Sequence, residues 1–184
     1  MAKLILYTAL SLDYQIARAD GAIDWLEDPT YVIEQEDFGA QDFYASIGYT
    51  LMGNNTYRQI LEMDVPFPYP DTQNFVFSRF KDLRDTQYVK FVHTDVLDFV
   101  RKLKASADRD IWLIGGEQIN TLLLQAGLID QMILTILPVI IGQGIPLFSD
   151  TALQSKWRLT AANTFPNGFV QLSYDFIEVE RLPS

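Results

Sequence analysis

Three short segments carry residue types that suit a phosphate group. Two of them join a glycine turn to the start of a predicted helix: Gly53-Asn54-Asn55-Thr56 and Ile114-Gly115-Gly116-Glu117-Gln118. Glycine lets the backbone approach a ligand closely, and the first amides of a helix have no partner within it. The third segment, Ser78-Arg79, ends a predicted strand with a hydroxyl and a guanidinium, which suit a phosphate monoester. Together the three segments predict a phosphate-bearing ligand.

These turns match neither of the two well-known phosphate motifs. The spacing differs from that of the dinucleotide glycine fingerprint and from that of the phosphate-binding loop with its lysine. A paired glycine after a strand more often marks a simple turn, and a serine and an arginine there usually face solvent. The prediction therefore depends on all three turns lying at strand ends.

Composition excludes several other kinds of site. The chain has no cysteine and one histidine, His93, so thiolate chemistry, disulfides and a multi-histidine metal centre are excluded, and we expect no metal. The net charge of −10 disfavours nucleic acid and anionic membranes as partners. We expect His93 to make a local hydrogen bond or to be exposed at a helix start.

Length and hydropathy predict a single domain over residues 1–184 in the cytoplasm. The apolar run Lys3–Leu10 is interrupted by Asp13, so a buried strand explains it better than a signal peptide. The apolar stretch Met132–Gly142 is shorter than the roughly 20 residues of a membrane helix.

Alternating strands and helices must position the three turns. The predicted strands are apolar runs at Lys3–Ser11, Tyr49–Met52, Asn74–Phe77, Val89–Val92, Ile111–Ile114 and Met132–Pro138. Helices are predicted over about Tyr31–Ile47, after Gly53-Asn54-Asn55-Thr56, after an N-cap at Thr94, and from Gly116 to a cap at Gly127. Asp13–Thr30 reads as a loop that Trp25 anchors, and Trp112 reads as core.

The alternation predicts an α/β fold with a mainly parallel sheet and helices on both faces, which is a three-layer αβα arrangement. The last two segments, Trp157–Phe165 and Phe169–Val179, are joined by Pro166-Asn167-Gly168 and predict an antiparallel hairpin at the C-terminal end. Ligands of such sheets bind outside the carboxyl ends of the strands, where the three turns lie.

Several blocks together resemble a known family over nearly the whole chain. They are Ser11-Leu12-Asp13, Asp20-Gly21, Asp24-Trp25-Leu26, Leu51–Tyr57, Ile111–Gly116, Leu128-Ile129-Asp130 and Pro138–Phe148. In order and spacing these blocks resemble the dihydrofolate reductase-like superfamily. They are most similar to stand-alone proteins like the reductase domain of bacterial riboflavin-biosynthesis deaminase-reductases.

The resemblance implies NADPH as cofactor, a small-molecule substrate and a homodimer. By position, it implies Ala9 and Ile16 beside the nicotinamide and the substrate near Asp13 and Trp25. The implied phosphate contacts are Gly53, Asn54, Asn55, Thr56, Gly115, Gly116, Glu117 and Gln118, and Ser78 with Arg79 would meet the adenosine end. For Glu117, a favourable place in the first helical turn is also a sufficient explanation.

Two positions depart from the family pattern. Tyr14 stands where many relatives place a glycine, which predicts an altered loop near the substrate. Asn54 stands where an arginine is common, so selectivity for NADPH over NADH would need Arg58, Arg79 or Lys81.

A carboxylic acid is the expected source of the proton that accompanies a hydride. The nearest candidates to the loop tryptophan are Glu27 and Asp28, with Asp13 and Asp24 as alternatives, and for each a solvated or capping role is the commoner one. Two other functions stay open: a protein of the same fold that binds the cofactor without catalysis, and a pteridine reductase of the dihydrofolate reductase type.

Overall fold

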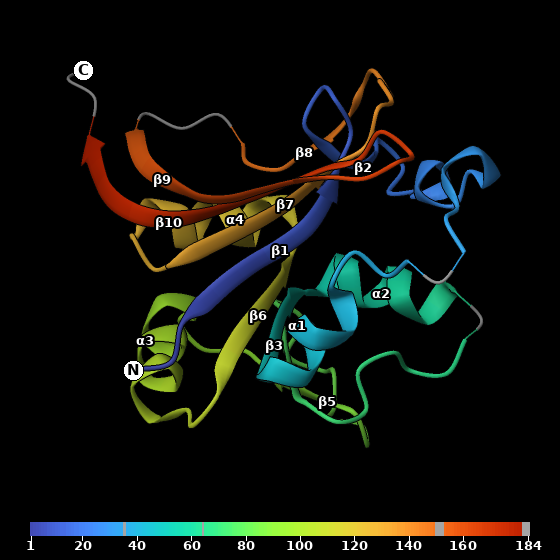
Figure 1. Cartoon of the computed structure of the whole chain (residues 1–184). Coiled ribbons are helices and arrows are strands. Elements are labelled where there is room, and N and C mark those ends of the chain that lie inside the picture. The colour runs from blue at the N-terminus through green and yellow to red at the C-terminus, as the bar shows by residue number, and fades with distance from the viewer. Residues whose placement is uncertain (35, 64, 150–152, 182–184) are drawn as a thin grey trace.

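The computed structural model describes residues 1–34, 36–63, 65–149 and 153–181. Its main sheet has eight strands in the order β5-β4-β3-β6-β1-β7-β10-β9 (Figure 1). The strands are β1 (Leu4–Leu10), β3 (Ile47–Gly53), β4 (Gln73–Phe77), β5 (Val89–Val92), β6 (Asp110–Gly115), β7 (Gln131–Ile136), β9 (Leu153–Thr164) and β10 (Val170–Arg181).

Strand pairing is parallel from β5 through β7 and antiparallel at the C-terminal end. β1 lies between β6 and β7 with both neighbours parallel, because helical crossovers return the chain to the same edge. β10 runs antiparallel to β7, and β9 runs antiparallel to β10. The predicted mainly parallel sheet with a C-terminal hairpin is confirmed.

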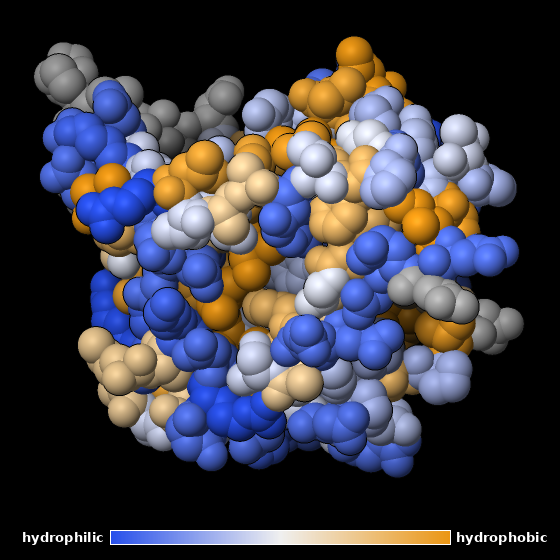
Figure 2. All heavy atoms as spheres, in the orientation of Figure 1, coloured by the Kyte–Doolittle hydropathy of each residue, from blue (hydrophilic) through white to orange (hydrophobic). Residues whose placement is uncertain are grey.

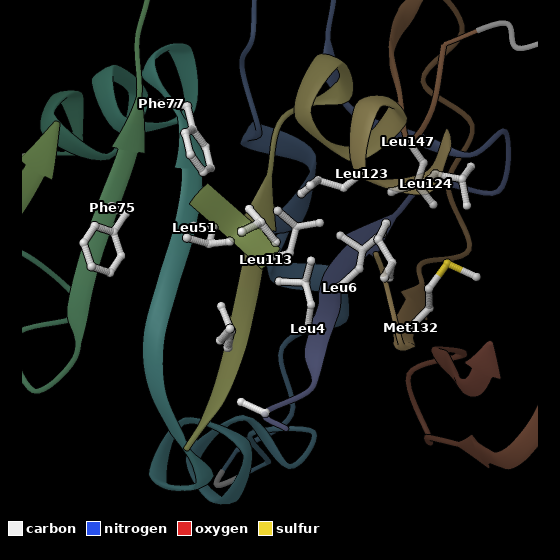
Figure 3. Packing of buried hydrophobic residues seen from close by; sticks show 14 of the residues in the cluster. Leu4, Leu6, Leu51, Phe75, Phe77, Leu113, Leu123, Leu124, Met132 and Leu147 are labelled. Carbon is white, nitrogen blue, oxygen red and sulfur yellow. The ribbon is translucent and has the colours of Figure 1, made fainter. Parts of the chain in front are cut away.

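Helices cover both faces of the sheet. They are α1 (Ala40–Ser46), α2 (Asn54–Glu62), α3 (Val96–Ser106) and α4 (Glu117–Gln125). Leu51 packs in the cluster that includes α3 and α4, and the next residue, Met52, packs with α2. Because successive strand side chains point to opposite faces, α2 and α4 lie on opposite sides of the sheet. Figure 3 shows the cluster on the α4 side, with Leu6, Leu113 and Leu123 pointing toward one another.

The predicted helix over Tyr31–Ile47 is wrong in its first half. Only α1 is an α-helix there, and residue 35 lies outside the described residues. Phe38 and Gly39 have positive φ of 56° and 79°, which a right-handed helix does not accommodate. Asp37 instead turns the chain, because its carboxylate accepts hydrogen bonds from the amides of Gly39 and Gln41.

Two further local predictions need correction. The Asp13–Thr30 segment contains strand β2 (Gln15–Arg18), which pairs antiparallel with β8 (Gly144–Pro146), and a 3₁₀ helix, Asp24–Leu26. A second 3₁₀ helix, Pro29–Tyr31, begins at its end. The N-cap of α3 is Asp95 rather than Thr94, because the Asp95 carboxylate accepts from the amide of Asp98. The predicted cap at Gly127 is confirmed, since Gly127 follows the C-cap residue Ala126 with φ +62° and its amide donates to the carbonyl of Leu124.

Within the described part of the chain, no helix is long and apolar enough to cross a membrane.

Candidate functional site

The candidate site lies at the carboxyl edge of the sheet, where the chain leaves two adjacent strands in opposite directions. From β3 the chain continues through α2 to β4, toward one edge of the sheet. From β6 it continues through α4 to β7, past β1 and toward the other edge. The ends of β3 and β6 therefore diverge and leave a crevice, which is where ligands bind open α/β sheets.

The two glycine turns meet at this crevice. The Thr56 hydroxyl donates a hydrogen bond to the carbonyl of Gly115 across 3.2 Å. A Cβ on Gly116, whose φ is +108°, would lie 3.1 Å from that same hydroxyl. The backbone between the turns is thus close packed, and a side chain at Gly116 would occupy the space beside it.

Both helix N-termini at the crevice keep backbone amides available. α2 begins after Gly53 and α4 after Gly116, and neither of these described helices has a side-chain N-cap hydrogen bond. Unpaired amides together with the positive ends of two helix dipoles favour an anion at this place. The polar side chains that border it are Asn54, Asn55, Glu117 and Gln118, with Asn55 and Gln118 exposed.

Ser78 and Arg79 end the neighbouring strand on the α2 side of the crevice. The Ser78 hydroxyl accepts from the amide of Phe80 at 3.1 Å. Arg79 is exposed and makes no salt bridge among the described residues, so its guanidinium is available to a ligand.

His93 lies beside Ser78, which our sequence reasoning missed. Its Nδ1 lies 3.1 Å from the Ser78 carbonyl, and because a carbonyl only accepts, Nδ1 carries the proton of this bond. The imidazole also stacks on Phe91 with 10° between the ring planes. Ser78 directly follows β4 and His93 directly follows β5, and these two strands are adjacent and parallel. This pairing of the two strand ends is the signal that could have placed His93 beside Ser78.

The two residues expected beside the nicotinamide pack in different clusters. Ala9 packs with Trp25, Leu137 and Phe169. Ile16, on β2, packs instead against the cluster on the α3 and α4 side. Trp25 is 4% exposed, and its indole Nε1 has no hydrogen-bond partner among the described residues. A buried donor without an acceptor is costly unless a ligand or water completes it.

Asp13 fastens the loop that follows β1. Its carboxylate accepts from the Ser11 hydroxyl at 2.6 Å and from the amides of Ile141 and Gly142 at 3.3 and 2.9 Å. The bond from Ser11, with help from those amides, lowers the pKa of Asp13. Tyr14 follows with φ +59° and a side chain that is 56% exposed, so the departure from glycine places a tyrosine in a left-handed conformation.

The four candidate proton donors hold surface hydrogen bonds or face solvent. Asp28 caps a 3₁₀ helix through the Thr30 amide at 2.8 Å, and the hydrogen bonds with Thr30 lower its pKa. Asp24 pairs with Arg18 at 2.6 Å, which lowers the pKa of Asp24. Glu27 is exposed. Carboxyl groups with lowered pKa are ionised at neutral pH and are poor proton donors there.

The sheet face above β1 and β6 carries a polar and aromatic group that sequence reasoning missed. Gln171 donates through Nε2 to the Phe38 carbonyl at 3.0 Å and to the Thr135 hydroxyl at 3.1 Å. Tyr7 lies beside this pair, and burial raises its pKa. Trp112 is half-buried rather than enclosed, with its Nε1 donating to the Tyr7 carbonyl at 2.9 Å. Figure 2 shows the face hollowed over these strands.

Comparison with known proteins gives one family over most of the chain. Residues 2–171 match the RibD C-terminal domain family. YwjB, an uncharacterized protein of Bacillus subtilis strain 168, is 35% identical over 94% of this chain and 97% of its own length. YyaP, a second uncharacterized protein of that strain, is 32% identical over 94% of each chain.

Solved structures share the fold. A provisionally named riboflavin biosynthesis protein from Shewanella sp. PV-4 superposes with a TM-score of 0.85 at 25% identity, over 97% of this chain and 100% of its own. The Thermotoga maritima diaminohydroxyphosphoribosylaminopyrimidine deaminase/5-amino-6-(5-phosphoribosylamino)uracil reductase superposes with a TM-score of 0.70 at 15% identity. This chain covers 57% of that longer protein, so the second likeness concerns one part of it and its fold alone.

Proposed function

This chain belongs to the RibD C-terminal domain family, and on that basis we propose that it is an NADPH-dependent reductase of a small heterocyclic or carbonyl compound. The observation that carries the proposal is the meeting of the two glycine turns where β3 and β6 diverge. Two helix N-termini with free amides suit a pyrophosphate, which carries negative charge, better than they suit a neutral ligand.

The residues at the crevice fit NADPH. Gly116 leaves a space that a Cβ would fill, and the exposed cation of Arg79 lies at the end of an adjoining strand, β4. Gly53–Thr56 and Gly115–Gln118 would hold the phosphates, and Ser78 with Arg79 would hold the adenosine end. When bound, NADPH supplies the hydride.

The chain's own residues orient the reactants and exclude water. Ala9 and Trp25 pack in one apolar cluster, so a nicotinamide ring that lies against Ala9 would be covered by buried aromatic side chains. The free Nε1 of Trp25 is a donor for a carbonyl or ring nitrogen of the substrate. Asp13 keeps the adjoining loop closed against residues 141 and 142, which sets the entrance to this part of the site. Glu27 and Asp28 are the nearest candidates for the proton donor, with Asp13 and Asp24 as alternatives.

Binding without catalysis is the second candidate function. It is favoured by the contacts that three of the candidate proton donors make: Asp13 accepts a hydrogen bond from Ser11, Asp24 pairs with Arg18, and Asp28 caps a 3₁₀ helix. The same glycine turns would serve such a protein, so cofactor binding alone does not separate the two functions.

We expect the wild-type protein to bind NADPH saturably, with quenching of tryptophan fluorescence and a dissociation constant of about 1 μM to 1 mM. Loss of absorbance at 340 nm is then followed with a 5-amino-6-ribosylaminouracil phosphate and, separately, with dihydrofolate. Binding without oxidation of NADPH would favour the non-catalytic function, and turnover of dihydrofolate would favour a pteridine reductase. No saturation at millimolar NADPH would contradict both the reductase and the cofactor-binding protein.

We also propose that two copies of the chain pair through the C-terminal hairpin. The apolar strand β7 lies inside the sheet between β1 and β10, so it offers no edge to a second copy. At the C-terminal end of the sheet the edge strand is β9, a 12-residue strand that pairs with β10 alone among the described strands of the main sheet. Leu159 on β9 and Ile177 on β10 are 53% and 46% exposed. Light scattering at micromolar concentration should give about twice the 21.0 kDa chain mass. A monomer mass would contradict the proposal.

A further inference from the structure

Asn120 is a fully buried amide in the first half of α4, directly behind the glycine turn. It is 1% exposed, and its Nδ2 donates to the carbonyl of Leu147 at 3.1 Å. The same side chain fills the space on the inner side of Gly115, because a Cβ built on Gly115 would lie 2.5 Å from Oδ1. One side chain thus contacts the glycine turn and a segment 27 residues further along the chain.

The Oδ1 atom of Asn120 is an unusual feature of this contact. It is buried and has no hydrogen-bond partner among the described residues. A leucine would occupy a similar volume without a buried acceptor, so packing alone does not explain an amide at this position. What a leucine lacks is the Nδ2 donor that holds Leu147.

Leu147 in turn contacts the loop after β1. Its amide donates to the carbonyl of Tyr14 at 3.2 Å, and the amide of Tyr14 donates to the carbonyl of Ser11 at 3.0 Å. The segment before Leu147 is β8, which pairs with β2, the strand that carries Ile16. A continuous series of hydrogen bonds therefore runs from α4 through Leu147 to the loop that precedes Ile16.

We propose that Asn120 is a positioning residue that couples the glycine turn at Gly115-Gly116 to the Ser11–Gln15 loop, and so couples the two ends of the bound cofactor. This inference rests on the proposed function, because it assigns the phosphates to the turn and the nicotinamide to the loop side. Asn120 touches neither end of the ligand. It sets the distance between the parts of the protein that do.

Thr121 provides a matched control one residue further along α4. It is also buried, and its hydroxyl accepts from the Ser149 amide at 2.8 Å and donates to the Glu117 carbonyl at 2.8 Å. Thr121 thus joins α4 to the same segment beyond Leu147, but it takes no part in the hydrogen bonds that reach Tyr14. Thr121→Val should lower stability without affecting the binding of one end of the cofactor more than the other.

The test compares two ligands, NADPH and 2′-phospho-ADP-ribose, which keeps the phosphates and adenosine but lacks the nicotinamide. For Asn120→Leu we expect NADPH to bind about tenfold more weakly, the size of an ordinary coupling between sites, with little change for 2′-phospho-ADP-ribose. For Thr121→Val the ratio of the two dissociation constants should equal that of the wild type. Equal weakening of both ligands in Asn120→Leu would show a role in the phosphate turn alone and would overturn the coupling, as would no weakening of either ligand.

A second variant keeps the proposal testable if Asn120→Leu does not fold. Asn120→Asp retains the shape and can donate to Leu147 only when protonated, so its NADPH affinity should approach that of the wild type as the pH falls. If the ratio of the NADPH affinity of Asn120→Asp to that of the wild type does not change with pH, the result counts against the coupling. If the wild type binds 2′-phospho-ADP-ribose and NADPH equally well, the coupling fails while the phosphate site stands. If it binds neither, the proposed function itself fails.

Discussion

Gly116→Val should weaken NADPH binding by about a hundredfold, the effect of losing two hydrogen bonds to charged phosphate at about 1.5 kcal/mol each. The reason is the position of Gly116 immediately before α4, where the free amides are. Its Cβ would lie 3.1 Å from the Thr56 hydroxyl, and two further methyl groups would fill the space beside the turn. A pyrophosphate and a valine side chain would therefore compete for one place.

The substitution should also reduce stability. Gly116 has φ +108° and ψ 134°, a conformation that side-chain-bearing residues rarely adopt, and holding valine there costs about 1–3 kcal/mol. Gly39→Ala is the matched control for backbone strain. Gly39 also has positive φ, +79°, and a Cβ there would have nothing within 4 Å.

The measurement is an NADPH titration of both variants together with their unfolding in urea. Gly39→Ala should lose stability and keep the wild-type affinity, and Gly116→Val should lose both. Unchanged NADPH affinity in folded Gly116→Val would show that the phosphates do not bind at this turn. The proposed function would then lose its main support.

Arg79→Ala should weaken NADPH by roughly tenfold to a hundredfold and leave NADH almost unchanged, corresponding to about 1.5–3 kcal/mol for a charge-assisted pair. Arg79 lies one residue beyond Ser78 at the end of β4, and it is exposed. A guanidinium can bind the 2′-phosphate with two parallel hydrogen bonds, and NADH lacks that phosphate. Because Asn54 supplies no charge at the α2 turn, Arg79 is the cation expected to select NADPH.

Arg84→Ala controls for the change in net charge. Arg84 is exposed in the same connection between β4 and β5, and its guanidinium donates to the carbonyl of Lys81 at 3.1 Å. Dissociation constants for both cofactors should be measured at one fixed ionic strength, since exposed charge pairs are screened by salt. Equal weakening of NADPH and NADH in Arg79→Ala would assign Arg79 to the pyrophosphate or the fold. No weakening of either would place the adenosine end elsewhere.

Local sequence patterns determined most of the sheet and its turns. Short apolar runs such as Asn74–Phe77 predict strands because they are buried on both faces. Gly115 and Gly116 predict a turn because residues with a side chain rarely adopt their positive φ. Parallel strands bring their carboxyl ends to one edge, so the edge that carries the candidate site followed from the alternation of strands and helices.

Other elements were missed because their local signals are weak or ambiguous. β2 and β8 have 4 and 3 residues, too few for an alternating pattern to be recognised. The apolar spacing of Phe38, Phe43 and Ile47 resembles a helix, yet Phe38 turns outward into an aromatic group with Phe165 and Phe169. Tertiary packing outweighs helix propensity at such a position.

Only the tertiary structure decided which of these parts meet. β3 and β6 are adjacent although two strands, β4 and β5, lie between them in the sequence, and this adjacency brings Thr56 to Gly115. The contact of Asn120 with Leu147 and the burial of Trp25 with Phe169 likewise join distant segments. The sequence pattern reports which conformation each short segment prefers. The order of the strands depends instead on the packing of whole faces against one another, which no short segment contains.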